Sequence, residues 1–216
     1  MTHSRTPLLN FGAAIAGVAL ALAAGCSSAP PVRYHTLMPD EVPQRAAGAG
    51  QAGGAATISV VLETIRVPAQ VDQPQWLVRL PEGSLAVLEQ DRWASPLRDE
   101  MRQALLEALN ARYGVTEARN APGVAPLRVA LDVRRFDSVP GQEVRIEGSW
   151  TIVSGEGGKS SKQCEWFYRE PAAAGMQPLA AAHRRAWARL GDALGEGLVR
   201  ASRNEVVACP GIARSG

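Results

Sequence analysis

Histidine and cysteine are both scarce in this chain, and the motifs that would make them catalytic are missing. Each occurs three times among 216 residues. The sequence contains no G-x-S-x-G, H-E-x-x-H or G-x-G-x-x-G motif, and neither His35 nor His183 has a matched carboxylate or cysteine motif near it. We therefore expect no metal site, no cofactor and no enzymatic activity, although missing motifs do not by themselves exclude catalysis.

The chain also lacks an excess of positive charge. It carries 23 lysine and arginine residues against 21 aspartate and glutamate residues, and only Lys159 and Lys162 are lysines. A nucleic-acid-binding domain normally gathers basic residues into a patch, whereas here arginines and acidic residues are interleaved. The fragment Gly158-Lys159-Ser160 resembles the end of a phosphate-binding loop, but Val153 stands where that loop needs a glycine. We expect neither nucleic-acid binding nor a phosphate-binding loop.

No apolar run is long enough to span a bilayer well, but a shorter run opens the chain. It extends from Leu8 to Leu22 and follows Arg5, the only formal charge before Cys26. A positive region, an apolar core and small residues in this order are typical of a secretory signal. The small residues 23–25 directly before Cys26 resemble a lipobox, which predicts removal of residues 1–25 and acylation of the cysteine. The alternatives are an ordinary signal peptide with an incidental cysteine, or a buried apolar helix.

The remainder of the chain has the length of one domain. Removal of residues 1–25 leaves 191 residues, enough for a full hydrophobic core. We expect a lipidated tether at residues 26–33 and a single domain at residues 34–216. Within that domain, residues 39–57 are rich in alanine, glycine and glutamine without an apolar period, which predicts a flexible loop.

Two cysteines remain once Cys26 is acylated. Cys164 and Cys209 lie 45 positions apart, and an even number of cysteines in an oxidising compartment permits a disulfide. Closing a loop of that length stabilises a protein by roughly 3–4 kcal/mol in the chain-entropy description. We predict the bridge, with two buried free thiols as the alternative.

Alternating apolar and polar residues predict several strands, and two amphipathic stretches predict helices. Strands are expected at residues 34–37, 58–68, 76–80, 85–88, 127–134, 144–152 and 162–168. One helix is expected to begin at Ser95-Pro96 and to end near Gly114, and the other to span residues 176–203. These elements predict an α/β fold, a single domain in which two long amphipathic helices pack on a mixed, largely antiparallel sheet.

Local signals refine the two helices. Ser95 is expected to be the N-cap of the first helix, with its hydroxyl accepting a backbone N–H and Pro96 at the first helical position. Asp99 and Glu100 favour the positive end of that helix. His183 falls in the arginine-rich second helix, where we expect a partly exposed packing residue.

Several short motifs resemble one known family in their order along the chain. Cys26-Ser27-Ser28 is followed by Tyr34-His35-Thr36-Leu37, then by I-R-V-P-A-Q-V-D-Q-P-Q-W-L-V-R from Ile65 to Arg79 and by R-W-A-S-P-L from Arg92 to Leu97. A hairpin and an alanine- and leucine-rich helix complete the order. The chain thus resembles the ABC-type transport auxiliary lipoproteins. It departs from them at Gln73, where arginine is usual, and in an Ala/Gly insertion at residues 46–56.

The resemblance implies both a fold and a role. The fold would be like an anticodon-binding domain. The role would be that of a docking subunit beside a mammalian-cell-entry (MCE) type ABC lipid transporter, with the partner a periplasmic MCE-domain protein and a homo-oligomer left open. Ser27, rather than aspartate, follows the acylated cysteine, so the anchor is expected on the periplasmic face of the outer membrane. An envelope-enzyme regulator and a periplasmic enzyme are the alternatives.

Five motif residues are candidates either for architecture or for a partner surface. They are Asp72, Gln73, Pro74, Trp93 and Pro96. Asp72 is expected to bond nearby backbone N–H groups in a turn, and Trp93 to pack over the start of the helix. We favour the architectural interpretation for all five.

Overall fold

The computed structural model describes residues 30–40, 57–155 and 160–211. The chain divides into two compact units, Met1–Pro31 and Val32–Gly216, and the fold below is that of the second unit. The predicted signal segment 1–25, Cys26 and nearly all of the predicted loop 39–57 lie outside the described residues.

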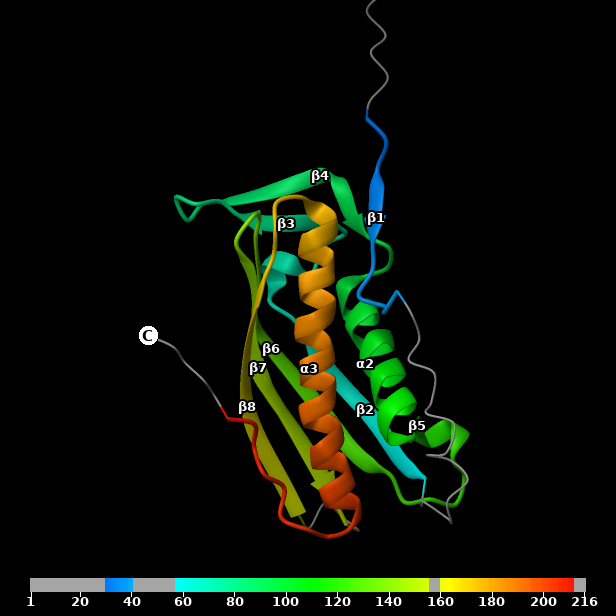
Figure 1. Cartoon of the computed structure of the whole chain (residues 1–216). Helices are drawn as coiled ribbons and strands as arrows, with labels where there is room; N and C mark the ends of the chain where they lie inside the picture. The colour runs from blue at the N-terminus through cyan, green and yellow to red at the C-terminus, as the bar shows by residue number, and fades with distance from the viewer. Residues whose placement is uncertain (1–29, 41–56, 156–159, 212–216) are drawn as a thin grey trace, which may run out of the picture. The chain divides into compact units, whose positions relative to one another are not determined.

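A five-stranded sheet forms the body of the second unit (Figure 1). In spatial order its strands are β5 (Val115–Glu117), β2 (Ile58–Arg66), β6 (Leu127–Val139), β7 (Glu143–Ser154) and β8 (Ser160–Pro171). Strand β2 runs parallel to both β5 and β6, whereas β6, β7 and β8 form an antiparallel meander. The predicted alternation is confirmed in β6, where Leu127, Val129 and Leu131 are buried and Arg128 is exposed. The sheet is therefore mixed, as predicted, and the short parallel strand β5 is an addition.

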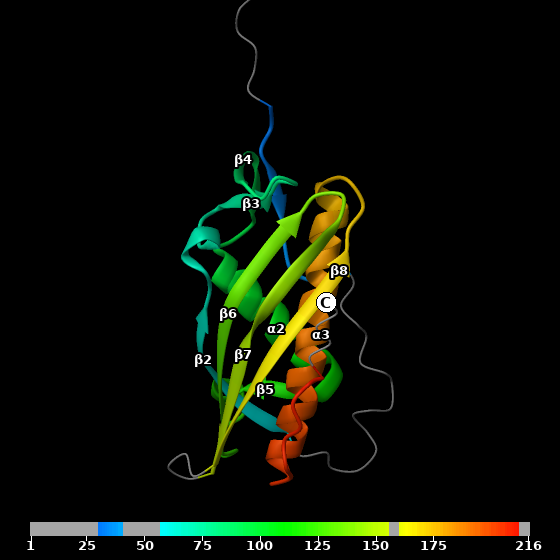
Figure 2. The same cartoon turned by 90° about the vertical axis from the view of Figure 1, so that its left-hand side faces the viewer.

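Two helices, α2 (Leu97–Tyr113) and α3 (Met176–Ser202), cover one face of this sheet. Figure 2 looks onto the opposite face, with β6, β7 and β8 in front of the helices. That open face carries ion pairs such as Arg128 with Glu63 (2.6 Å), which suit an antiparallel sheet solvated on one side. Gly114 ends α2 in the left-handed conformation that favours glycine, as predicted. Within the described part of the chain, no helix is both long and apolar enough to cross a membrane.

A second, three-stranded sheet lies at one end of the domain (Figure 1). Its spatial order is β1 (Arg33–His35), β4 (Leu85–Trp93) and β3 (Gln75–Arg79). Strands β3 and β4, at the positions of two predicted strands, form a hairpin, and β1 pairs with β4 in parallel. The strand expected at residues 34–37 ends at His35, because Thr36 and Leu37 bind a carboxylate of α2 instead of a neighbouring strand.

Candidate functional site

The segments that carry the family resemblance meet between the three-stranded sheet and the first turn of α2. We call residues 33–37, 72–76 and 91–100 the motif corner. The backbone N–H of Trp93 donates to the carbonyl of Pro74 (2.9 Å), and that of Ala94 donates to the carbonyl of His35 (2.8 Å). These bonds join three segments that are remote in sequence.

The five predicted candidate residues all lie in the motif corner. They are Asp72, Gln73, Pro74, Trp93 and Pro96. Trp93 is 4% exposed and stacks on Trp76, with the ring centroids 4.2 Å apart. The carboxylate of Asp72 accepts from the guanidinium of Arg98 (2.7 Å), where a bond from a backbone N–H was expected. The motif corner thus holds a buried tryptophan pair. It also holds an exposed ion pair, Asp72 with Arg98, that joins the loop before β3 to helix α2.

Glu100 organises the start of α2, a role that was not predicted from the sequence. Pro96 occupies the N-cap position, without a side-chain cap. The prediction of Ser95 as N-cap is wrong, because its hydroxyl donates to Glu100 Oε1 (2.9 Å). The other oxygen of Glu100 accepts from the Thr36 hydroxyl (2.6 Å) and from the Leu37 backbone N–H (2.9 Å). Because Glu100 is only 4% exposed, these charge-assisted bonds tie the segment after β1 to the helix away from water.

Asp91 is a second buried carboxylate and binds β1 directly. Arg33 donates to both of its oxygens, from Nε (2.9 Å) and Nη2 (2.6 Å), and His35 Nε2 lies 2.8 Å from Oδ1. The hydrogen bonds from Arg33 lower the pKa of Asp91 against the opposing effect of burial, and the bond to His35 lowers it further. Strand β1 is therefore held to β4 by an ionised carboxylate as well as by the parallel ladder.

A buried polar chain continues from the tryptophan pair into α3. Trp76 Nε1 donates to Ser138 Oγ (2.8 Å), and Ser138 Oγ lies 2.7 Å from His183 Nε2. His183 stacks on Phe136 at a centroid distance of 4.1 Å. The prediction that His183 is partly exposed is wrong, because it is fully buried, and this burial lowers its pKa to about 3. The imidazole of His183 is therefore neutral, and its hydrogen bond is the one between Nε2 and the Ser138 hydroxyl.

Ser138 and His183 stand at the spacing of a nucleophile and its base, yet their surroundings do not suit catalysis. Ser138 is 1% exposed and His183 is 0% exposed, so a substrate has no path to the hydroxyl. The Ser138 hydroxyl also accepts from Trp76, which keeps it inside a structural network. The bonds of Ser138 to Trp76 and His183 are thus structural, while His183 Nδ1 is buried without a hydrogen-bond partner.

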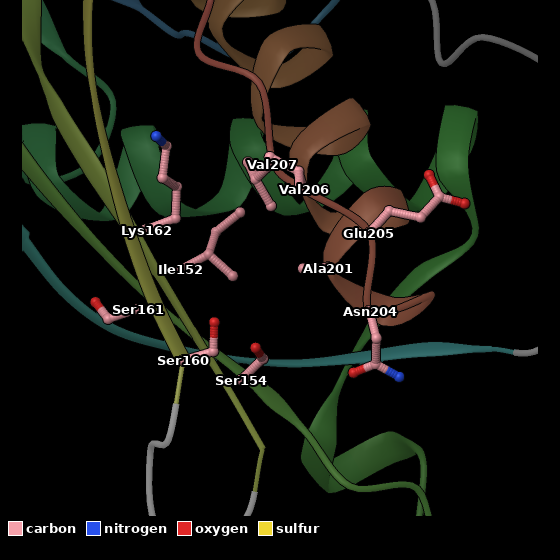
Figure 3. Close-up of a pocket in the computed structure, with 10 residues that line it drawn as sticks. All are labelled: Ile152, Ser154, Ser160, Ser161, Lys162, Ala201, Asn204, Glu205, Val206 and Val207. Carbon is pink, nitrogen blue, oxygen red and sulfur yellow. The ribbon is translucent and has the colours of Figure 1, made fainter.

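A crevice of about 450 Å³ lies at the far ends of β7 and β8, beside the chain that follows α3 (Figure 3). Ile152 and Val207 form its apolar wall, and the hydroxyls of Ser154 and Ser160 point into it. The carboxylate of Glu205 is directed away from this space (Figure 3). Ser160 begins strand β8 and does not open a helix.

Cys164 and Cys209 are joined in the structure, with their Cα atoms 5.2 Å apart. Cys164 is buried in β8, and Cys209 belongs to the segment after α3. The bond would hold that segment against the edge strand of the five-stranded sheet. Over residues 30–40, 57–155 and 160–211, no three His, Cys, Asp or Glu side chains are grouped as metal ligands.

Comparison with known proteins places the chain in a sequence family and supports the fold. A family described as the ABC-type transport auxiliary lipoprotein component matches residues 39–195, which is more than half of the chain. None of the curated proteins matches the chain in sequence. A crystal structure of an uncharacterized protein superimposes with a TM-score of 0.60 at 15% identity, covering 77% of this chain and 97% of that one. A Xanthomonas campestris protein of family DUF330 gives 0.55 at 19% identity, covering 81% and 96%.

Proposed function

The chain belongs to the family of ABC-type transport auxiliary lipoprotein components, and from this we propose that it is the outer-membrane-anchored docking subunit of an ABC lipid transport system. In this proposal residues 1–25 are removed, Cys26 is acylated, and the domain lies on the periplasmic face of the outer membrane. Its partner is a periplasmic MCE-domain protein that carries an apolar substrate between the two membranes. The chain itself performs no chemistry and maintains envelope integrity by docking.

The attachment of β1 to the domain is the observation that carries this proposal. Asp91 binds Arg33 and His35, and Glu100 binds Thr36 and Leu37, so the end of the tether and the residues after it are fixed to the body. Because an extended chain spans at most about 3.3–3.6 Å per residue, the tether from Cys26 to Arg33 reaches roughly 25 Å. An anchor at Cys26 would therefore hold a rigid domain close to the membrane.

The motif residues also serve architecture rather than chemistry. Trp76 and Trp93 stack inside the domain, and the buried Ser138–His183 pair is closed to a substrate. A pre-formed, rigid surface suits docking, since little conformational entropy is lost when such a surface binds.

Capture from crosslinked envelopes tests the proposal. A tagged chain should incorporate labelled palmitate, sediment with outer membranes and co-purify with an MCE-domain protein. Cys26→Ser should lose the label and the membrane association, because the thiol that carries the lipid is gone. Ser27→Ala is the matched control and should keep both.

Two results would refute parts of this proposal separately. Labelling that persists in Cys26→Ser would overturn the assignment of the anchor. Capture of a cell-wall enzyme in place of an MCE-domain protein by the anchored chain would favour a regulatory role.

A further inference from the structure

One face of the three-stranded sheet turns away from the core. In register, Tyr34 lies beside Arg92, Arg92 beside Gln75, and Leu77 beside Val87. His35, Trp76 and Trp93 directly follow Tyr34, Gln75 and Arg92 in sequence. Their rings contact one another on the buried side of the sheet, and the register between β3 and β4 is irregular at this point. Paired residues share a face of a sheet, so Tyr34, Leu77 and Val87 belong to the outward side.

This outward face carries several exposed apolar side chains together with the polar Gln75, Arg79 and Arg92. Tyr34 is 64% exposed, Leu85 is 44% exposed and Val87 is 43% exposed, while Val32 directly before β1 is 38% exposed. Single exposed apolar side chains need no explanation, but several on one face mark an interaction surface. We call Val32, Tyr34, Leu85 and Val87 the outer face. Leu77, on the same side of β3, is partly buried and packs against the core.

The chain that leads to the anchor enters at this face. Val32 lies near the end of the tether at residues 26–33, and Tyr34 directly follows it. The contour length of the tether is at most roughly 25 Å. Tyrosine is an amphipathic residue that favours the boundary between lipid and water. Arg92, which lies on the same side, bonds only the backbone carbonyl of Glu89 among the described residues, so its charge is free to meet lipid phosphates.

We propose that the outer face rests on the headgroup region of the bilayer that holds the lipid anchor. The inference rests on the proposed acylation of Cys26 and adds an orientation to it. The hairpin and β1 lie against the membrane, so the far ends of β7, β8 and α3 point toward the periplasm, where the transport partner would be met. Exposed aliphatic side chains, a tyrosine and an arginine together suit a zwitterionic and anionic phospholipid surface.

Site-specific photocrosslinking in vesicles tests this orientation. The acylated mature chain is reconstituted in vesicles of phosphatidylethanolamine and phosphatidylglycerol, with p-benzoylphenylalanine placed at Tyr34, at Val87 or at Val61. Val61 is the matched control, because it is 37% exposed but lies beside Arg128 on the open face of the five-stranded sheet. After irradiation, mass analysis should find phospholipid adducts several-fold more often at Tyr34 and Val87 than at Val61.

Flotation of each labelled chain with the vesicles separates this inference from the proposed anchor. Chains that float without preferential lipid adducts at Tyr34 and Val87 would overturn the orientation and leave the anchor standing. Adducts between two chains at these positions would overturn it in favour of self-association. Chains that fail to float would refute the anchor and the orientation together.

Discussion

His183 is held neutral by the residues packed around it. Its ring stacks on Phe136 and bonds Ser138, and burial lowers its pKa to about 3 from an ordinary value of 6.5. Between these two values the unfolded chain binds a proton that the folded chain does not. The free energy of unfolding therefore falls as the pH falls through this window.

The first prediction concerns this titration. From about pH 8 to about pH 5, His183 should reduce the free energy of unfolding by about 2 kcal/mol, because one pKa unit corresponds to about 1.4 kcal/mol. His183→Phe should remove this part of the pH dependence, as measured by urea unfolding at both pH values. The lowered pKa of Asp91 acts in a different window, since stability from a depressed carboxyl is lost only below its ordinary value of 3.8.

Ser138→Ala is the matched control for His183. It removes the hydrogen bond to the ring but leaves the imidazole buried, so the pH slope should persist although the protein is less stable at every pH. A His183→Phe protein with the same slope as the wild type would contradict the assignment.

At the scale of single elements, one glycine lies where the register of the β6–β7 pair shifts. The register between these strands shifts between Val133 and Arg135, and Gly148 lies opposite the shift. A Cβ at position 148 would stand 2.1 Å from the carbonyl oxygen of Asp132 and 2.6 Å from the ring of Trp166. An isolated glycine within an alternating strand pattern is a known signal for such a bulge.

The second prediction follows from this contact. Gly148→Ala should lower the free energy of unfolding by about 1–3 kcal/mol or more, because the backbone oxygen of Asp132 cannot move aside as a side chain can. Gly191→Ala on α3 is the control, since its Cβ would meet only side-chain atoms, those of Ala108 at 3.4 Å and Leu105 at 3.8 Å. That change should stabilise the helix by about 0.5–1 kcal/mol. Chemical denaturation of both variants measures the two effects, and equal effects would refute the close approach.

At the scale of the whole molecule, the segment that follows α3 lies beside the edge strand of the five-stranded sheet. Strand β8 is an edge strand, and Cys209 meets it at Cys164. Unpaired edge strands are prone to pairing with other chains, so a covalently held segment beside β8 also protects it. The bridge would thus stabilise the domain and limit association at one edge.

The third prediction is that this bridge forms in the exported protein. In the Cys26→Ser chain, alkylation under denaturing, non-reducing conditions should modify no cysteine. Cys209→Ser should lower the free energy of unfolding by roughly 3–4 kcal/mol, as expected for a loop of this length. Two alkylated thiols without reductant, or an unchanged stability after reduction of the unmodified chain, would rule the bridge out.

Local patterns in the sequence determined most of the elements of this domain. Alternation predicted the strands that became β6 and β7, and an amphipathic stretch predicted α3 almost to its last residue. These signals are readable because strand pleat, turn chemistry and helix period act over only a few residues. The motif order also indicated the family without reference to the fold.

Tertiary structure alone decided the partners of the buried polar residues. Glu100 lies three residues after Leu97, and His183 four residues after Leu179, so each falls on the buried face of its helix despite being polar. Helical spacing therefore contained a signal for both burials, but not the identity of Thr36 or Ser138 as partners. The spacing of residues along a helix shows which face of the helix is buried. The residues that cover this face come from distant segments, and tertiary packing decides which they are.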